Sequence, residues 1–287
     1  MKTIVVLIDP SHSSTTVGNS CLLLASKLHA NILLFSTYIL LPETAVYAGA
    51  PWIDQGTSIW EADTKEKLEK TASELTSNYS KLYPEGFKTT IHTQLAEGNV
   101  GVCVADLIKN KKIELVMMGA KSGNTIDHIL LGSDTRSVIN HSHRPILIIP
   151  QDTSLKKINK ITFASNFDLN EIKGIAYLVK LAHLFNFHLE IVHVREIGEK
   201  DQLQTEQVQS FMAQVENLKY PKINHQLIRG KDIIKRLNRF CKEKDTDILA
   251  ILHYQSNFLE RLLTKSTTKT ALSNQKIPLL VFPSKME

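Results

Sequence analysis

Cysteine is scarce in this sequence of 287 residues. The three cysteines, Cys21, Cys103 and Cys241, are an odd number, lie far apart and have apolar neighbours. A disulfide framework needs paired cysteines, and a structural zinc site needs ligands at short spacing. We therefore expect reduced cysteines in the core and neither kind of cross-link.

Long apolar runs are also missing. The longest, Ile32–Leu41, contains serine and threonine and is far shorter than the roughly 20 residues that cross a bilayer. The amino-terminal stretch MKTIVVLIDPSHSS passes from one lysine directly into an alternating apolar segment, without a small-residue cleavage site. We expect a cytoplasmic protein with no membrane span.

The sequence has no long run of like-charged residues. The net charge is +5, and the excess of Lys and Arg falls in residues 151–287. The lysines there are single or paired and are not interleaved with aromatic residues. This distribution indicates a solvated surface, and we expect no nucleic-acid partner.

Apolar runs bounded by turn residues alternate with longer amphipathic stretches, which is typical of a parallel sheet with crossover helices. Together with the chain length, this pattern predicts two α/β domains. In the first half, strands are predicted at Thr3–Asp9, Asn31–Thr37, Phe87–Leu95, Ile113–Met118 and Pro145–Ile149, and helices at Ser13–Leu28, Ser58–Leu82, Val100–Asn110 and Ser133–Asn140.

The second half repeats this order. KITFASN begins 157 residues after TIVVLID, and IPLLVFP begins 133 residues after RPILIIP. Most of the difference corresponds to a predicted loop, Leu40–Trp60, for which the second half has only a short polar turn near Val194–Asp201. We predict domains at 1–151 and 158–287, joined by a short linker.

A glycine pattern follows the fourth predicted strand, in the stretch MMGAKSGNTIDHILLGSD. Together with Asp9 at the end of strand one and the closing strand PILIIP, it resembles the motif of universal stress proteins in their tandem two-domain form. The resemblance spans essentially the whole chain. It implies a doubly wound, five-stranded parallel sheet in each domain, with strand order 3-2-1-4-5.

Glycine at such positions lets the main chain approach a polyphosphate closely. The helix predicted from Ser133 would offer free N–H groups and a positive dipole end to an anion. The same residues could instead only punctuate loops, with Ser133 as a helix cap. Ser122 stands where the family has a glycine, and Asp134 would compete with an anionic ligand unless Mg²⁺ bridges the two.

The resemblance implies that the first domain binds ATP or AMP. It assigns the adenosine end to Asp9 and the base to the main chain near Ser36 and Thr37. The set of nucleotide-binding residues that it implies is Asp9, Ser36, Thr37, Met118, Gly119, Ser122, Gly123, Gly132, Ser133 and Asp134.

The second copy has lost this pattern. At the offsets of 133 and 157, Gly119 corresponds to Leu252, Gly132 to Lys265, and Asp9 to Asn166. We therefore predict that the second domain binds no nucleotide in the family manner.

Other chemistry finds little support. Neither a Walker nor a dinucleotide motif occurs, and His128, His141 and His143 lack further ligands for a metal. We predict no catalytic residue.

Three functions remain open: a nucleotide-responsive stress or regulatory protein, an interaction scaffold without nucleotide, and a slow ATPase. The apolar closing strands are expected to pair within the chain or in a homodimer.

Overall fold

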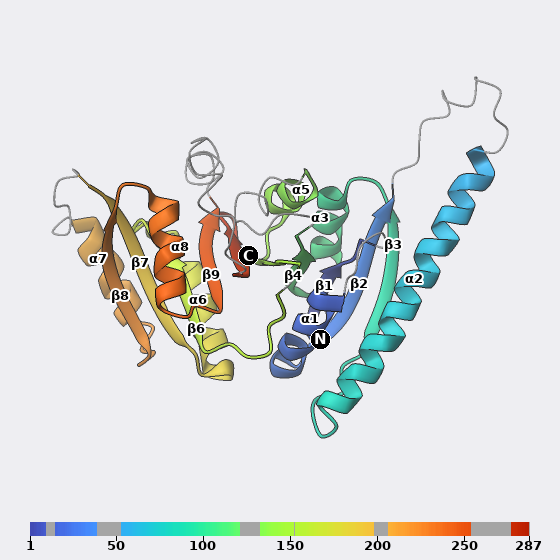
Figure 1. Ribbon diagram of the computed structural model, residues 1–287, viewed down its shortest axis with the longest axis horizontal. Coiled ribbons are helices and arrows are strands. Elements are labelled where there is room, and N and C mark those ends of the chain that lie inside the picture. Colours follow the sequence, from blue (N-terminus) through green and yellow to red (C-terminus); the bar gives the residue numbers. More distant parts are fainter. Residues whose placement is uncertain are drawn as a thin grey trace.

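The computed structural model describes residues 1–9, 15–38, 53–120, 133–151, 153–197, 206–253 and 277–286. In these residues ten strands form one sheet, with helices on both faces (Figure 1). The strands are β1 (Thr3–Leu7), β2 (Asn31–Tyr38), β3 (Ile91–Glu97), β4 (Ile113–Gly119), β5 (Ile146–Ile149), β6 (Lys160–Ala164), β7 (His188–Glu196), β8 (Ile223–Gly230), β9 (Ile248–His253) and β10 (Leu279–Pro283). The helices are α1 (Thr15–Leu28), α2 (Ile53–Leu82), α3 (Val100–Asn110), α5 (Ser133–His141), α6 (Glu171–Phe185), α7 (Glu206–Glu216) and α8 (Ile233–Glu243).

The sheet order is β3-β2-β1-β4-β5-β10-β9-β6-β7-β8. Each half therefore has the order 3-2-1-4-5, and all strand pairs within a half are parallel. The predicted α/β fold class and strand order are confirmed.

The strand register shows the duplication directly. Ile4 of β1 is paired with Leu115 of β4, and Ile161 of β6 is paired with Ile248 of β9. Ile161 lies 157 residues after Ile4, and Ile248 lies 133 residues after Leu115. These are the two offsets read from the sequence.

The two halves meet where β5 and β10 pair antiparallel, with Leu147 opposite Leu280. These two leucines are equivalent at the offset of 133, so a pseudo-twofold axis passes between them. Of the two predicted arrangements, the chain adopts the internal one, and each closing strand covers the other. The outermost strands of the sheet are β3 and β8.

Alternation along the strands divides the core into two layers. Ile4 and Val6 pack on the side of α1, α2, α6 and α7, whereas Val5 and Leu7 pack on the side of α3, α5 and α8. All three cysteines are free. Cys21 and Cys241 are buried as predicted, but Cys103 is only half-buried.

Several predicted boundaries were wrong. Strand β1 ends at Leu7 and not at Asp9, so Asp9 lies just beyond the strand. Helix α2 begins at Ile53, inside the predicted loop and before the predicted helix start at Ser58. Strand β3 begins at Ile91 and not at Phe87. The carbonyl of Phe87 accepts hydrogen bonds from the Tyr79 hydroxyl and from a nearby main-chain N–H, which holds this segment in a turn.

No helix in the described part of the chain combines the length and apolar character needed to cross a bilayer.

Candidate functional site

The first half brings polar and glycine positions together at the carboxyl ends of its central strands. Strand β1 lies between β2 and β4, which is the topological switch point of this sheet and the usual place for ligands in open α/β folds. Leu7 pairs with both Phe35 and Met118 at this edge. The described residues of the predicted site that lie here are Asp9, Ser36, Thr37, Met118 and Gly119.

These residues differ in accessibility. Ser36 and Met118 are buried, whereas Asp9, Thr37 and Gly119 are half-buried. The partly exposed main chain at Thr37 and Gly119 and the carboxylate of Asp9 therefore remain at the surface of this edge, above a packed core.

Gly119 ends β4 opposite Ile149 of β5. Its backbone lies outside the positive-φ region. A Cβ atom added to it would meet no heavy atom within 4 Å in the described part of the protein. Neither backbone conformation nor packing among these residues requires glycine here, yet its absent side chain leaves the main chain bare at the mouth of the crevice.

Helix α5 starts with Ser133 and Asp134. The Ser133 hydroxyl is exposed and lies 3.4 Å from a carboxylate oxygen of Asp134. The carboxylate thus occupies the first turn, where the helix dipole stabilises negative charge. An anionic ligand at the amino end of α5 would compete with Asp134 for the same favourable interaction with the helix dipole, as predicted from the sequence.

The position of α5 is fixed by α3. The Ser137 hydroxyl of α5 donates a hydrogen bond to Asn99 Oδ1 at 2.5 Å. Asn99 also caps α3 by accepting from the main-chain N–H of Gly101 at 2.9 Å. A methyl group on Gly101 would overlap both carbonyl atoms of Ser137, with the carbonyl carbon 2.5 Å away. Close contact between the two helices therefore requires glycine at 101.

The sequence analysis missed Asn99 and Gly101. Asparagine just before a predicted helix is a cap signal, but the contact with Ser137 joins residues 38 positions apart. Three predicted site residues, Ser122, Gly123 and Gly132, lie outside the described residues. What the structure brings together is the bare end of β4, the ends of β1 and β2, and the helix that follows the glycine motif.

The equivalent edge of the second half carries aromatic side chains. Phe167 occupies the place of Pro10 and has a left-handed backbone, with φ of 60°. Its ring contacts that of His193, the counterpart of Ser36, with centroids 4.7 Å apart and the planes tilted by 30°. His193 Nδ1 lies 2.8 Å from the carbonyl oxygen of Ser165. The second half thus carries an aromatic pair at the edge where the first half has Ser36.

A buried carboxylate fastens the same loop. Glu171 is 2% exposed, and its carboxylate accepts hydrogen bonds from the Asn166 main-chain N–H at 2.9 Å and from the Ser165 hydroxyl. The Phe167 N–H in turn donates to the Ser165 hydroxyl. Burial raises the pKa of Glu171 to about 7, although these hydrogen bonds oppose the shift. Leu252, the counterpart of Gly119, is also buried.

The histidines set aside as metal ligands are held by the main chain. His141 Nδ1 lies 2.7 Å from the Ser137 carbonyl oxygen, and His143 Nδ1 lies 3.2 Å from that of Lys285. His128 is outside the described residues. Within the ranges that the structure covers, no three His, Cys, Asp or Glu side chains are grouped as metal ligands.

Comparison with known proteins agrees with this architecture. Residues 1–150 match the universal stress protein family. A universal stress protein of Methanocaldococcus jannaschii is 26% identical over 148 residues, which are 52% of this chain and 81% of the relative. Crystal structures of universal stress proteins from Archaeoglobus fulgidus and Pseudomonas aeruginosa have TM-scores of 0.68 and 0.62 at 17% and 14% identity. Both cover 98% of this chain, and the alignments include 96% and 92% of those chains. The chain therefore belongs to the universal stress protein family.

Proposed function

We propose that the first half binds ATP or AMP and that the protein acts as a nucleotide-responsive stress or regulatory protein. The observation that carries this proposal is the bare main chain at Gly119, where glycine has no role among the described contacts. A phosphate lying along this main chain would explain why a side chain is absent there.

The remaining contacts follow from the order of the elements along the edge. The adenosine end lies by Asp9, just after β1, and by the main chain of Ser36 and Thr37 in β2. The phosphates pass Gly119 toward the amino end of α5, where free N–H groups and the helix dipole favour an anion. A Mg²⁺ ion bound here would be held by the Asp134 carboxylate and would offset the negative charge of the phosphates. The proposed role is binding, without catalysis.

We infer one nucleotide per chain, because the second half lacks the features that form the proposed site in the first half. Its equivalent edge carries Leu252 in place of Gly119, and the aromatic pair of Phe167 and His193, with His193 in place of Ser36. Its role in the proposal is structural. Gly119 pairs with Ile149, and the next strand beyond β5 is β10 of the other half. A change at Gly119 is therefore one strand away from the junction between the halves. We call the proposed phosphate site, formed by the main chain at Gly119 and the amino end of α5, the cradle.

Gly119→Ala tests the cradle without disturbing the fold. A methyl group at this position contacts no described atom, so the free energy of unfolding should change by less than about 0.5 kcal/mol, as at neutral surface sites. The same methyl group excludes a phosphate from the main chain, and we expect ATP affinity to fall at least about tenfold, which corresponds to about 1.4 kcal/mol. Calorimetric titration and urea unfolding measure the two quantities.

Thr90→Ala, an exposed change before β3 at the other end of the strands, is the matched control and should leave both quantities unchanged. An ATP isotherm for Gly119→Ala that equals the wild-type isotherm would contradict the cradle. If the wild-type protein shows no ATP or AMP binding at millimolar concentration, the scaffold alternative replaces the proposal.

Asp134→Ala tests the charge at the amino end of α5. Without Mg²⁺, removal of this carboxylate should strengthen ATP binding by up to about fivefold, because like charges at a helix terminus interact by under about 1 kcal/mol. With Mg²⁺ the gain should disappear or reverse. Titrations in EDTA and in Mg²⁺ separate the two cases. Asp106→Ala removes an exposed carboxylate from α3 and should have no effect, whereas equal results for both variants would show that only net charge matters.

A further inference from the structure

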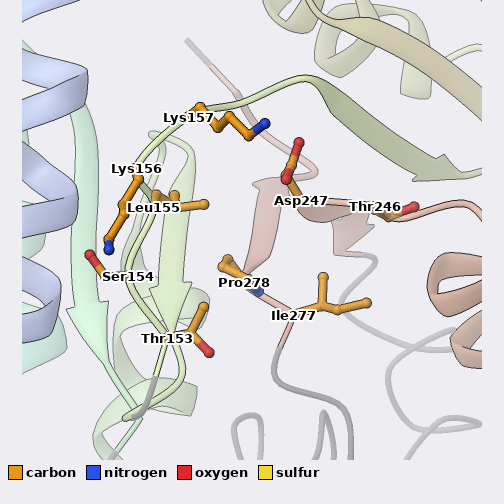
Figure 2. A pocket seen from close by; sticks show the side chains of 9 residues that line it. All are labelled: Thr153, Ser154, Leu155, Lys156, Lys157, Thr246, Asp247, Ile277 and Pro278. Carbon is orange, nitrogen blue, oxygen red and sulfur yellow. The ribbon is translucent and has the colours of Figure 1, made fainter.

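The linker between the halves bounds a pocket of about 300 Å³ (Figure 2). The polar side chains of its second-half wall are already engaged within the protein. Asp247 Oδ2 accepts hydrogen bonds from two main-chain N–H groups at the end of the linker, at 2.6 and 2.9 Å, and Lys157 extends toward this carboxylate in Figure 2. The Thr246 hydroxyl is hydrogen-bonded to that of Thr162 at 2.7 Å. These contacts fasten the linker to the second half, and unpaired polar groups lie elsewhere, on β8.

Strand β8 forms one end of the ten-stranded sheet and pairs only with β7 in the described part of the chain (Figure 1). The other outermost strand, β3, is flanked by the long helix α2. Strand β8 is eight residues long and contains neither a proline nor a register shift. The carbonyls of Lys222 and Gly230 accept hydrogen bonds from β7 and from the residue after it, at 2.9 and 3.2 Å, so the even-numbered residues turn their main chain toward β7. The main-chain N–H and C=O groups that consequently face away from the sheet are those of Ile223, His225, Leu227 and Arg229.

The side chains at these four positions alternate between apolar and basic. Ile223 and Leu227 are half-buried, whereas His225 and Arg229 are exposed and have no hydrogen bond or ion pair in the described part of the protein. Because the four positions are two residues apart, their side chains lie on one face of the sheet, the side of α7. The acidic residues of α7 are its first and its last. A strand added to this edge would therefore meet a row of apolar and basic side chains in alternation.

The surroundings of this edge hold the positive charge of the chain. Residues 219–245, which contain β8 and α8, have nine Lys and Arg against three Asp and Glu, and this net charge of +6 exceeds the +5 of the whole chain. Two of the three acids are engaged, since Asp232 caps α8 and Glu243 is paired with Arg236 and Arg239 at 3.4 and 2.7 Å. The basic residues are single or paired in the sequence, but the fold packs α8 against β8 and gathers them at one end of the molecule.

We propose that β8 accepts an extended acidic segment of a partner protein as an added strand. The outward main-chain groups of β8 hydrogen-bond to this segment, which is how strand addition gains its affinity. Its acidic side chains lie opposite His225 and Arg229, and its apolar side chains cover Ile223 and Leu227, because opposed side chains on one face of a sheet are in contact. The positive charge of the edge also opposes pairing with a second copy of β8. The surface is separate from the proposed nucleotide site.

The probe is a fluorescein-labelled peptide of sequence ETVTETVTE, titrated with the full chain and followed by fluorescence anisotropy. The peptide reads the same in both directions, so glutamate can face His225 and Arg229 in a parallel or an antiparallel pair. We expect a dissociation constant below about 1 mM. KTVTKTVTK reverses the charge of the peptide, and EPVPEPVPE keeps the charge but loses alternate N–H donors. Both should bind at least about tenfold more weakly, because one loses the ionic contacts and the other loses main-chain hydrogen bonds.

Two variants of the protein test the same contacts. Leu227→Pro removes one outward N–H group, and an edge strand tolerates proline where the N–H faces solvent. Arg229→Glu reverses an exposed charge and leaves the main chain intact. Each should weaken binding of ETVTETVTE at least about tenfold, with an unchanged circular dichroism spectrum, and Arg229→Glu should bind KTVTKTVTK more tightly than the wild-type protein does. Lys180→Glu, the same charge reversal at an exposed position on α6, is the matched control and should bind ETVTETVTE normally.

The proposal is overturned if ETVTETVTE does not bind at about 1 mM, if EPVPEPVPE binds equally well, or if Lys180→Glu weakens binding as much as Arg229→Glu does. A light-scattering mass of two chains that falls to one chain in Leu227→Pro would assign the edge to a second copy and reject the acidic partner. Gly119→Ala should bind the peptide like the wild-type protein, so a failure of the nucleotide proposal is distinguishable from a failure of this one.

Discussion

Gly101→Ala is expected to destabilise the protein by about 3 kcal/mol, at the upper end of the usual cost of overpacking. In an open helix the same change would stabilise, because alanine has a helix propensity about 1 kcal/mol better than glycine. Here the added methyl group overlaps both carbonyl atoms of Ser137. A backbone cannot rotate away as a side chain can, so α5 must move off α3.

Movement of α5 also affects the proposed phosphate site, because the amino end of this helix, at Ser133, is part of that site. We therefore expect Gly101→Ala to weaken ATP binding even at temperatures where the protein remains folded. Urea unfolding and calorimetric titration at a low temperature measure the two effects separately.

Gly18→Ala is the matched control, since Gly18 also lies in a helix against a close neighbour. The atoms that a methyl group would meet there are the end carbons of the Leu75 side chain, the nearest at 2.9 Å, and these can shift. Its effect on stability should be small, because improved propensity offsets the adjustment. If Gly101→Ala proved as stable as Gly18→Ala, the contact between α3 and α5 would not determine the position of α5.

The periodicity of the sequence predicted the strands and their duplication because buried parallel strands leave continuous apolar runs. It did not decide between an internal pair of closing strands and a homodimer. An apolar strand such as β5 has the same composition whether its neighbour is β10 of the same chain or a strand of another chain. That choice depends on the length and path of the linker, which its composition does not reveal.

The candidate site was predicted only in part for a similar reason. Gly119 ends β4 and Asp9 follows two residues after the end of β1, and the end of a strand can be read locally. Gly101 matters because of Ser137, which is far from it in sequence. The aromatic pair in the second half combines Phe167, from the loop after β6, with His193 of β7, so no local pattern indicated it. Ser122, Gly123 and Gly132 remain predictions.

Glu171→Gln is expected to make the protein more stable than wild type above pH 7, by about 3 kcal/mol. Glutamate in an unfolded chain has a pKa near 4.3, whereas burial raises the pKa of Glu171 to about 7 in the folded protein. Between these two pKa values the folded state retains a proton that the unfolded state has lost, and this makes the wild-type protein progressively less stable as the pH rises. The difference of roughly 2.5 pKa units corresponds to about 3 kcal/mol.

The sign follows from proton binding. Below about pH 4 the carboxyl group is protonated in both states and its favourable contribution is fully present. As the pH rises toward 7 the folded state binds more protons than the unfolded state, so the free energy of unfolding falls. Above pH 7 both states are ionised and the loss is constant. Asp168, on the same loop, adds to the raised pKa through its negative charge, and the His193 ring lies against Phe167 beside it.

Glutamine at this position does not titrate, but it can keep the hydrogen bond from the Asn166 N–H and donate to the Ser165 hydroxyl. The stability difference between Glu171→Gln and wild type should therefore grow from pH 5 to pH 7.5, as measured by urea unfolding at each pH. Glu206→Gln, an exposed glutamate in the first turn of α7, should show no such growth. A constant difference across this range would mean that Glu171 is already ionised at pH 5 and that hydrogen bonds from the loop outweigh its burial.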